Sequence, residues 1–111
     1  MNAVTILVWN YHDKDIRGES SDVEVSVKHT PSQGAVLYHY RIDRRHSNSY
    51  EAWKRMGSPQ HPTQEQIREL EKSGRLEMLG EPMRIRAENN LLRIRMQLPR
   101  QAVSLLKVVM E

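Results

Sequence analysis

The strongest constraint on the fold is a series of short apolar runs, rich in valine, isoleucine and leucine, that polar turn segments separate. Their length is that of β-strands and is too short for most helices. The connections are short enough to join antiparallel neighbours. The sequence therefore predicts a mainly β fold, an antiparallel β-sandwich of about six or more strands with a short helical insertion. The predicted strands cover residues 3–11, 23–27, 35–42, 82–87, 91–98 and 102–110.

The first and last of these runs are apolar on both faces. In residues 3–11 the alternating valines and isoleucine would lie on one face, with Leu7 and Trp9 on the other. In residues 102–110, Leu105 and Leu106 are neighbours, which allows a β-bulge at that point. A strand in a half-solvated antiparallel sheet should alternate between apolar and polar residues. We therefore expect both strands to be covered on two sides, by the insertion or by another domain.

The runs 82–87 and 91–98 predict a β-hairpin, because the intervening Glu-Asn-Asn favours a turn. Four arginines alternate out of this hairpin: Arg84, Arg86, Arg93 and Arg95. One interpretation is a basic patch for an acidic ligand, such as nucleic acid or a uronic acid. The other is a solvated face that neighbours such as Glu24 balance. We favour the second, because no aromatic residue stands between the arginines to stack on bases.

Residues 46–79 interrupt the strands with a helical pattern. Ser49 is the expected N-cap of a first helix, and Gly57 its end. Thr63 and Gln66 have capping-box spacing at the start of a second helix, which Gly74 ends. A turn at 30–34 precedes the strand before this insertion.

The insertion also holds two of the few aromatic residues, Tyr50 and Trp53, in a chain that is 5% aromatic. Aromatic rings stack well on a sugar ring, and the alternative is that these two anchor the insertion to the sheet through the large area that they bury. Both roles stay open for the pair. Binding residues expected in this segment are His46, Asn48, Tyr50 and Trp53, as contacts to another domain or to a cleft.

Other classes of site find little support. The chain has no cysteine, and its five histidines lack metal-ligand spacing, so we expect no metal and no cofactor. The nearest cluster is His12, Asp13 and Asp15, which a solvated loop explains. Acidic residues lie in loops or on a helix surface, without the apolar surroundings that raise the pKa of a catalytic acid. No catalytic residue is predicted in these 111 residues.

Length, charge and hydropathy limit the number of domains and the kinds of partner. A length of 111 residues fits one domain, 1–111, and the net charge of +3 permits an acidic partner without requiring one. No apolar run approaches the length of a membrane span, and residues 1–11 lack the features of a signal peptide. We therefore expect neither a membrane nor a nucleic acid as a partner, and the localisation stays open.

Three stretches resemble one known family: VTILVWNYHDKDI, YHYRIDRRHSNSYEAWKRMGSPQHPTQEQIRELEKSGRLEML and LPRQAVSLLKV. They resemble the C-terminal region of glycoside hydrolase family 39, the family of β-xylosidases with α-L-iduronidase as a relative. The match runs from about Val4 to Val108. The segment HSNSYEAWKRMGSPQ makes the β-xylosidase branch look closer than the iduronidase branch.

The resemblance implies a retaining O-glycosyl hydrolase with a catalytic (β/α)₈ barrel and two glutamates upstream of this region. The barrel is absent from the chain, and Met1 looks like the start of a recombinant fragment or of a truncated reading frame. The expected role is therefore a non-catalytic accessory domain of a xyloside-hydrolysing enzyme that takes part in xylan degradation. Its expected partner is the barrel. A xylo-oligosaccharide and a second copy stay open as partners, and a free-standing carbohydrate-binding or protein-interaction module is the alternative.

Overall fold

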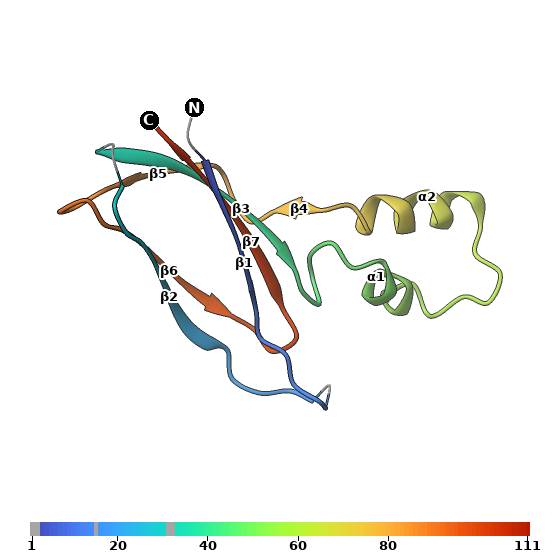
Figure 1. The fold of residues 1–111 in the computed structure, drawn as a ribbon. Coiled ribbons are helices and arrows are strands. Elements are labelled where there is room, and N and C mark those ends of the chain that lie inside the picture. Colours follow the sequence, from blue (N-terminus) through green and yellow to red (C-terminus); the bar gives the residue numbers. More distant parts are fainter. Residues whose placement is uncertain (1–2, 15, 31–32) are drawn as a thin grey trace.

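The computed structural model describes residues 3–14, 16–30 and 33–111. Two antiparallel sheets form the body of the molecule, and two helices extend from it (Figure 1). The large sheet has the order β1-β7-β3, and β3 also pairs with two short strands at different points along its other edge. Its strands are β1 (Ala3–Trp9), β3 (Gly34–Ile42), β4 (Glu77–Met78), β5 (Met83–Arg86) and β7 (Val103–Met110). The small sheet pairs β2 (Ser21–Val27) with β6 (Leu92–Leu98). The predicted mainly β sandwich is confirmed.

The core lies between the two sheets. Leu106 and Val108 of β7 are fully buried and pack with Leu37 of β3. Leu92 and Ile94 of β6 close the core from the small sheet. Burial of these side chains is the main favourable term in folding, at about 1.5–3 kcal/mol for each large one.

The predicted hairpin of residues 82–87 and 91–98 is wrong. The chain does reverse there, and Asn89 and Asn90 have the positive φ angles, 51° and 60°, of a tight turn. However, β5 pairs with β3 in the large sheet, whereas β6 pairs with β2 in the small one. Only an isolated bridge joins Glu88 to Leu91. Turn residues determine where the chain reverses, but the pairing follows from which sheet buries each strand's apolar side.

The last strand contains no bulge. Its register is continuous from Val103 to Val109 with β1 and from Val103 to Met110 with β3. Leu106 therefore faces the core and its neighbour Leu105 faces outward, so one strand supplies apolar residues to both faces of the large sheet.

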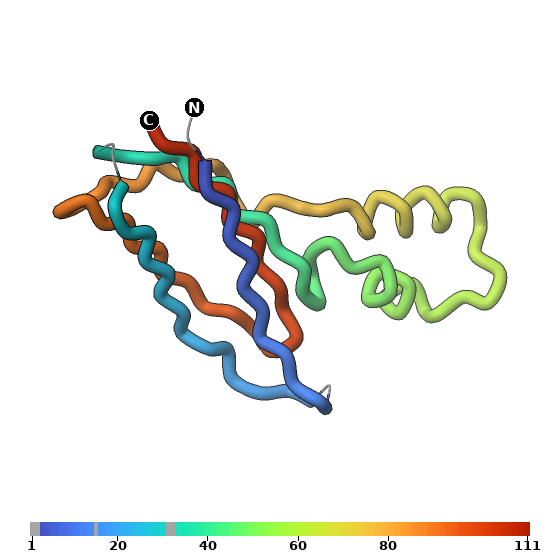
Figure 2. Tube along the Cα trace, viewed as in Figure 1, coloured from blue at the N-terminus to red at the C-terminus, as the bar shows by residue number. Residues whose placement is uncertain are grey.

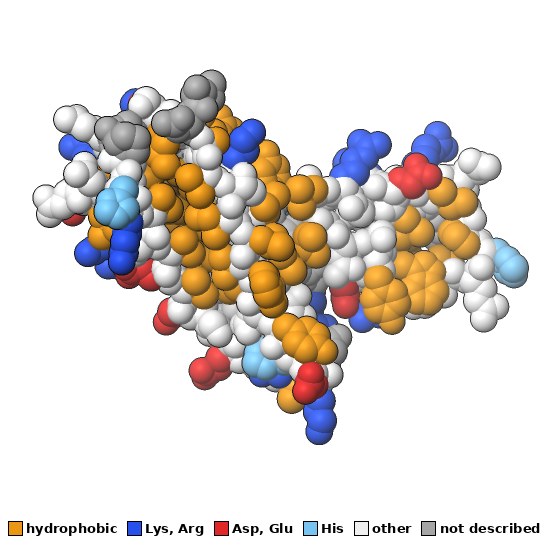
Figure 3. Space-filling view, viewed as in Figure 1, with side chains coloured by type: hydrophobic (Ala, Val, Ile, Leu, Met, Phe, Trp, Pro, Cys, Tyr) orange, Lys and Arg blue, Asp and Glu red, His pale blue; other side chains and the backbone are white. Residues whose placement is uncertain are grey.

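Cover on both faces of residues 3–11, by the insertion or by another domain, was also expected. Cover by the insertion is wrong for the described part of the chain, and cover by another domain stays a prediction. The inward-facing residues of β1 are partly buried against the core. Leu7 and Trp9, on the other face, are 54% and 63% exposed. Hydrophobic side chains are visible over this part of the surface (Figure 3). The insertion extends beyond the sheets and leaves this face open (Figure 1).

The insertion between β3 and β4 contains α1 (Ser49–Arg55) and α2 (Gln64–Ser73), which pack on each other. The chain leaves the sandwich after β3 and returns beside that strand at β4, so the insertion has a narrow base (Figure 2). The capping box of Thr63 and Gln66 is confirmed. The N-cap of α1 is Asn48 and not Ser49, because the Asn48 side chain accepts the Glu51 N–H at 3.1 Å. Within the described residues, neither helix is long and apolar enough to cross a membrane.

Candidate interdomain contact site

A network around Asp43 holds the base of the insertion. Asp43 Oδ1 accepts the backbone N–H groups of Arg45 and His46, each at 2.8 Å, and lies 2.8 Å from His46 Nδ1. Asn48 Nδ2 donates to the Asp43 carbonyl at 3.0 Å. Burial alone would raise the pKa of Asp43, but the hydrogen bonds from Arg45 and His46 outweigh it and lower the pKa. The carboxylate therefore orders the loop from which α1 begins.

Arg41 connects this loop to both sheets. Its side chain lies on the inner face of β3 and is 5% exposed. Nε donates to Ser104 Oγ at 2.9 Å, Nη2 donates to the Gln97 carbonyl of β6 at 3.1 Å, and Nη1 lies 3.5 Å from Asp43 Oδ2. A buried charge is tolerated when hydrogen bonds and a counter-charge satisfy it. One guanidinium thus links the large sheet, the small sheet and the insertion.

His39 completes this end of the sandwich. Its Nε2 lies 2.7 Å from Ser104 Oγ. Burial, together with the nearby positive charge of Arg41, lowers the pKa of His39, so the imidazole is neutral at neutral pH.

A serine beside a histidine is also the arrangement of a nucleophile and its base. Here Ser104 is completely buried, and its oxygen already accepts a hydrogen bond from Arg41. A substrate could not reach the hydroxyl without disrupting the core. The pair therefore serves packing and hydrogen bonding.

The aromatic residues lie on α1, away from this network. Tyr50 and Trp53 stack with ring centroids 5.9 Å apart and planes inclined by 28°. Trp53 Nε1 donates to the Pro59 carbonyl at 2.9 Å, and Lys54 Nζ lies 4.9 Å from the centre of the Tyr50 ring. Trp53 thus ties α1 to the segment before α2. The expected anchoring to the sheet is therefore wrong for Trp53, which anchors α1 to the other half of the insertion.

The four residues predicted from the sequence therefore divide into two pairs. His46 and Asn48 both bond to Asp43, so their polar groups are used within the loop. Tyr50 is 62% exposed and remains available to a partner. Arg41 and Asp43 were not predicted as part of this network. A signal for Arg41 was present in the sequence, because a charged residue on the inner face of a strand needs a buried partner.

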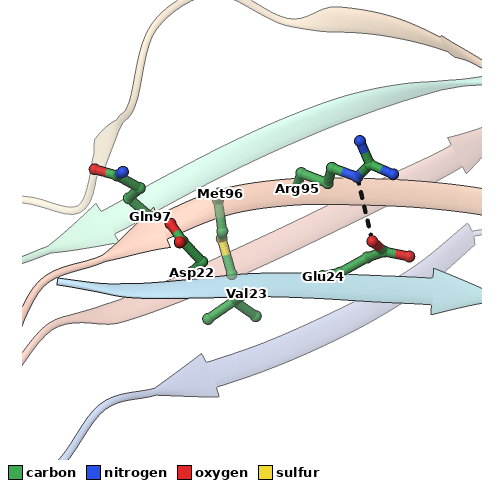
Figure 4. Close-up of a pocket in the computed structure, with 6 residues that line it drawn as sticks. All are labelled: Asp22, Val23, Glu24, Arg95, Met96 and Gln97. Atoms are coloured by element: carbon green, nitrogen blue, oxygen red, sulfur yellow. Dashed lines mark hydrogen bonds and ion pairs between the residues drawn. The ribbon is translucent and has the colours of Figure 1, made fainter.

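The arginines do not share one strand pair, because β5 and β6 belong to different sheets. Glu24 lies 3.2 Å from Arg95 and 3.9 Å from Arg93, and Arg84 lies 2.6 Å from Glu111. The expected balance by Glu24 is confirmed. An open hollow of about 380 Å³ lies beside the Glu24–Arg95 ion pair (Figure 4). Its lining residues are Asp22, Val23, Glu24, Arg95, Met96 and Gln97.

Within residues 3–14, 16–30 and 33–111, no three histidines or acids come close enough to hold a metal ion. In the cluster considered from the sequence, the His12 ring lies 2.9 Å from Asn10 Oδ1, and Asp15 is outside the described residues. Part of the expected turn at 30–34 is also outside them.

Comparisons with known proteins agree on one family. The model of glycosyl hydrolases family 39 matches residues 2–89. The family 39 enzyme from Xanthomonas axonopodis pv. citri has a TM-score of 0.80, with 18% identity over 98% of this chain and 24% of its own. A monomeric β-xylosidase from Caulobacter crescentus CB15 has a TM-score of 0.72, with 18% identity over 96% of this chain and 24% of its own.

A bacterial orthologue of human α-L-iduronidase has a TM-score of 0.70, with 18% identity over 98% of this chain and 20% of its own. Among curated proteins, none matches the chain. The chain spans at most 24% of the length of these three solved structures. The match of the family model over most of the sequence shows that the chain belongs to glycosyl hydrolases family 39.

Proposed function

We propose that the chain is a non-catalytic accessory domain of a β-xylosidase-like family 39 hydrolase, which cleaves O-glycosidic bonds of xylosides. The observation that carries the proposal is the coverage: two family 39 enzymes match this chain over at least 96% of its residues but only 24% of their own. A piece of that size beside a catalytic barrel supports the barrel and shapes its surroundings. The barrel is the proposed partner.

The described residues support a role without chemistry of its own. The buried polar side chains Arg41 and Ser104 bond to each other inside the sandwich. Glycosidases need two carboxyl groups at a set separation across a cleft. The carboxylate of Asp43, whose side chain is 11% exposed, is engaged by Arg45 and His46.

The insertion is the proposed contact to the rest of the enzyme. Its narrow base is ordered by Asp43 and Arg41, and Tyr50 is exposed on α1. Loops and insertions that a rigid scaffold positions are common places for binding residues. His46 and Asn48 hold the contact segment in place, and Tyr50 with Trp53 forms its surface.

A chimera tests the proposal. The quarter of the Caulobacter β-xylosidase that matches this chain is replaced by this chain, and a second version lacks the quarter altogether. We expect the chimera to unfold at a higher temperature than the deletion and to hydrolyse an aryl β-xyloside, while the purified chain alone does not. Turnover by the chain alone, abolished by a carboxylate substitution, would contradict the proposal, as would a chimera that behaves like the deletion.

A free-standing carbohydrate-binding module is the second candidate, because the Tyr50 ring is 62% exposed next to Trp53. Titration with xylo-oligosaccharides separates the two candidates. Tyr50→Ala would abolish binding by such a module, whereas Tyr11→Ala, at a tyrosine that is 70% exposed on another loop, would not. Lys54 lies over the face of the Tyr50 ring and competes with a sugar for it. We therefore expect xylo-oligosaccharides to bind neither the two variants nor the unsubstituted chain.

A further inference from the structure

We infer that the outward-facing side of the large sheet is a docking surface for an apolar protein surface that brings a carboxylate to Lys107. The inference rests on the proposed function, because the occupant to which it commits is the remainder of a family 39 hydrolase. It adds a second surface, the outward-facing side of the large sheet, to the contact proposed for the insertion.

The register of the strands defines this surface, here called the outer apolar face. Side chains that face away from the core line up across β1, β7, β3, β4 and β5 in four rows. Trp9, Val103 and Ile42 form one row; Leu7, Leu105, Tyr40 and Met78 the next; Thr5, Lys107 and Tyr38 the third; Ala3, Val109, Val36 and Arg84 the fourth.

Two of the rows are entirely apolar or aromatic, and they lie at the end of the sheet from which the insertion leaves. Leu7 is 54% exposed, Trp9 63% and Ile42 41%. Hydrophobic side chains over the sheet and a separate hydrophobic group over α1 are both visible in one view (Figure 3). Antiparallel sheets normally turn a polar side to water, and a wide apolar patch marks an interface.

Charge decides between the two candidate occupants. Lys107 is exposed in the third row, with Thr5 and Tyr38 as its cross-strand neighbours, and the four rows contain no acidic residue. No ion pair of Lys107 occurs among the described residues. In a two-fold contact the same patch meets itself, and its four rows offer no carboxylate to Lys107. A different partner with a carboxylate opposite Lys107 supplies the missing counter-charge.

Hydroxyl-radical footprinting tests the surface. The probe is the Xanthomonas family 39 enzyme without the quarter that this chain matches, mixed with the purified chain. We expect a complex in which oxidation of Leu7, Trp9 and Met78 falls at least about tenfold. Oxidation of Ile16 and Met83, which are 57% and 61% exposed elsewhere, should not change. If the truncated enzyme does not fold, the chimera that carries this chain is oxidised in the same way.

Charge reversal tests the role of Lys107. Lys107→Glu should weaken the complex about tenfold, and Lys107→Gln should weaken it less, because a lost attraction costs less than a repulsion. Arg93→Glu is the matched control on the small sheet and should leave the affinity unchanged. Circular dichroism of each variant verifies that it folds.

The outcomes separate this inference from the proposed function. A complex that protects Tyr50 and Trp53 but leaves Trp9 reactive overturns the docking surface and keeps the accessory role. Absence of any complex, together with a chimera that behaves like the deletion, overturns both. Self-association of the chain with Trp9 protected, detected by light scattering, overturns the inference in favour of a second copy.

Discussion

The two outward surfaces of the sandwich differ in character. On the small sheet, Glu24 of β2 lies between Arg93 and Arg95 of β6, and all three are exposed. On the large sheet, the outer apolar face carries two charges in its four rows, Lys107 and Arg84, and Arg84 is paired with Glu111. The two surfaces belong to one fold and enclose one core, so the difference does not arise from the needs of folding.

The contrast indicates which of the two surfaces faces water. The small sheet follows the usual alternation, with apolar residues inside and charged residues outside. The large sheet departs from it in β1 and in β7, where Leu105 and Leu106 face opposite sides. A chain gains nothing in folding from an apolar residue on a solvated face, so we attribute the departure to a partner.

The largest effect is expected inside the sandwich. Leu106→Ala removes a fully buried side chain and should lower the free energy of unfolding by about 2–5 kcal/mol. Leu105→Ala, one position earlier on the outer apolar face, should cost about 1 kcal/mol or less. Urea denaturation followed by circular dichroism measures both. Equal losses would show that the outer apolar face is already covered in the isolated chain.

A smaller effect is expected where the two sheets are linked. Arg41→Met removes the hydrogen bonds to Ser104 and to the Gln97 carbonyl and should lower the free energy of unfolding by about 1.5–3 kcal/mol. Arg45→Met, at an exposed arginine of the same loop, is the control and should change it by less than about 0.5 kcal/mol. Thermal unfolding distinguishes the two, and similar curves would disprove the link.

Acidification should lower the free energy of unfolding in two steps, the first from His39 on the inner side of the large sheet and the second from Asp43. The folded pKa of His39 is below its ordinary value of 6.5, so the unfolded chain takes up that proton at a higher pH. Stability is then complete above about pH 6.5 and falls as the pH decreases toward the folded pKa. Asp43, whose pKa is below 3.8, adds a second loss below about pH 4.

Thermal unfolding at a series of pH values verifies this order. His39→Gln should remove the first step and keep the second. His61→Gln, in the insertion between the helices, serves as the control and should keep both. A first step that survives in His39→Gln would assign it to another histidine.

The smallest effect is expected on the charged surface. Glu24→Gln breaks the exposed ion pairs with Arg93 and Arg95 and should cost less than about 1 kcal/mol. It also leaves both arginines without a counter-charge. We expect no tight binding to heparin or DNA by the unsubstituted chain, and at most weak, salt-sensitive binding by this variant. Tight binding that replacement of the arginines abolishes would make this surface a polyanion site.

The positions of the strands, of the second helix and of the insertion could be predicted from local sequence. Strand positions follow from apolar runs, and the capping box of Thr63 and Gln66 was predicted from four residues of sequence. The insertion at 46–79 was recognised because its periodicity differs from that of the strands. The contact roles of His46, Asn48, Tyr50 and Trp53 stay predictions, and the structure shows which of these side chains are already bonded within the chain.

Neighbouring residues therefore set the positions of the strands and helices and the points where the chain turns. The assignment of β5 and β6 to different sheets and the regular course of β7 are visible only in the folded chain. The same is true of the bridge between the two sheets that Arg41 makes to Gln97, 56 positions later. These outcomes depend on contacts between distant residues, which form where burial and hydrogen bonding are satisfied across the whole core, and no local pattern encodes that choice.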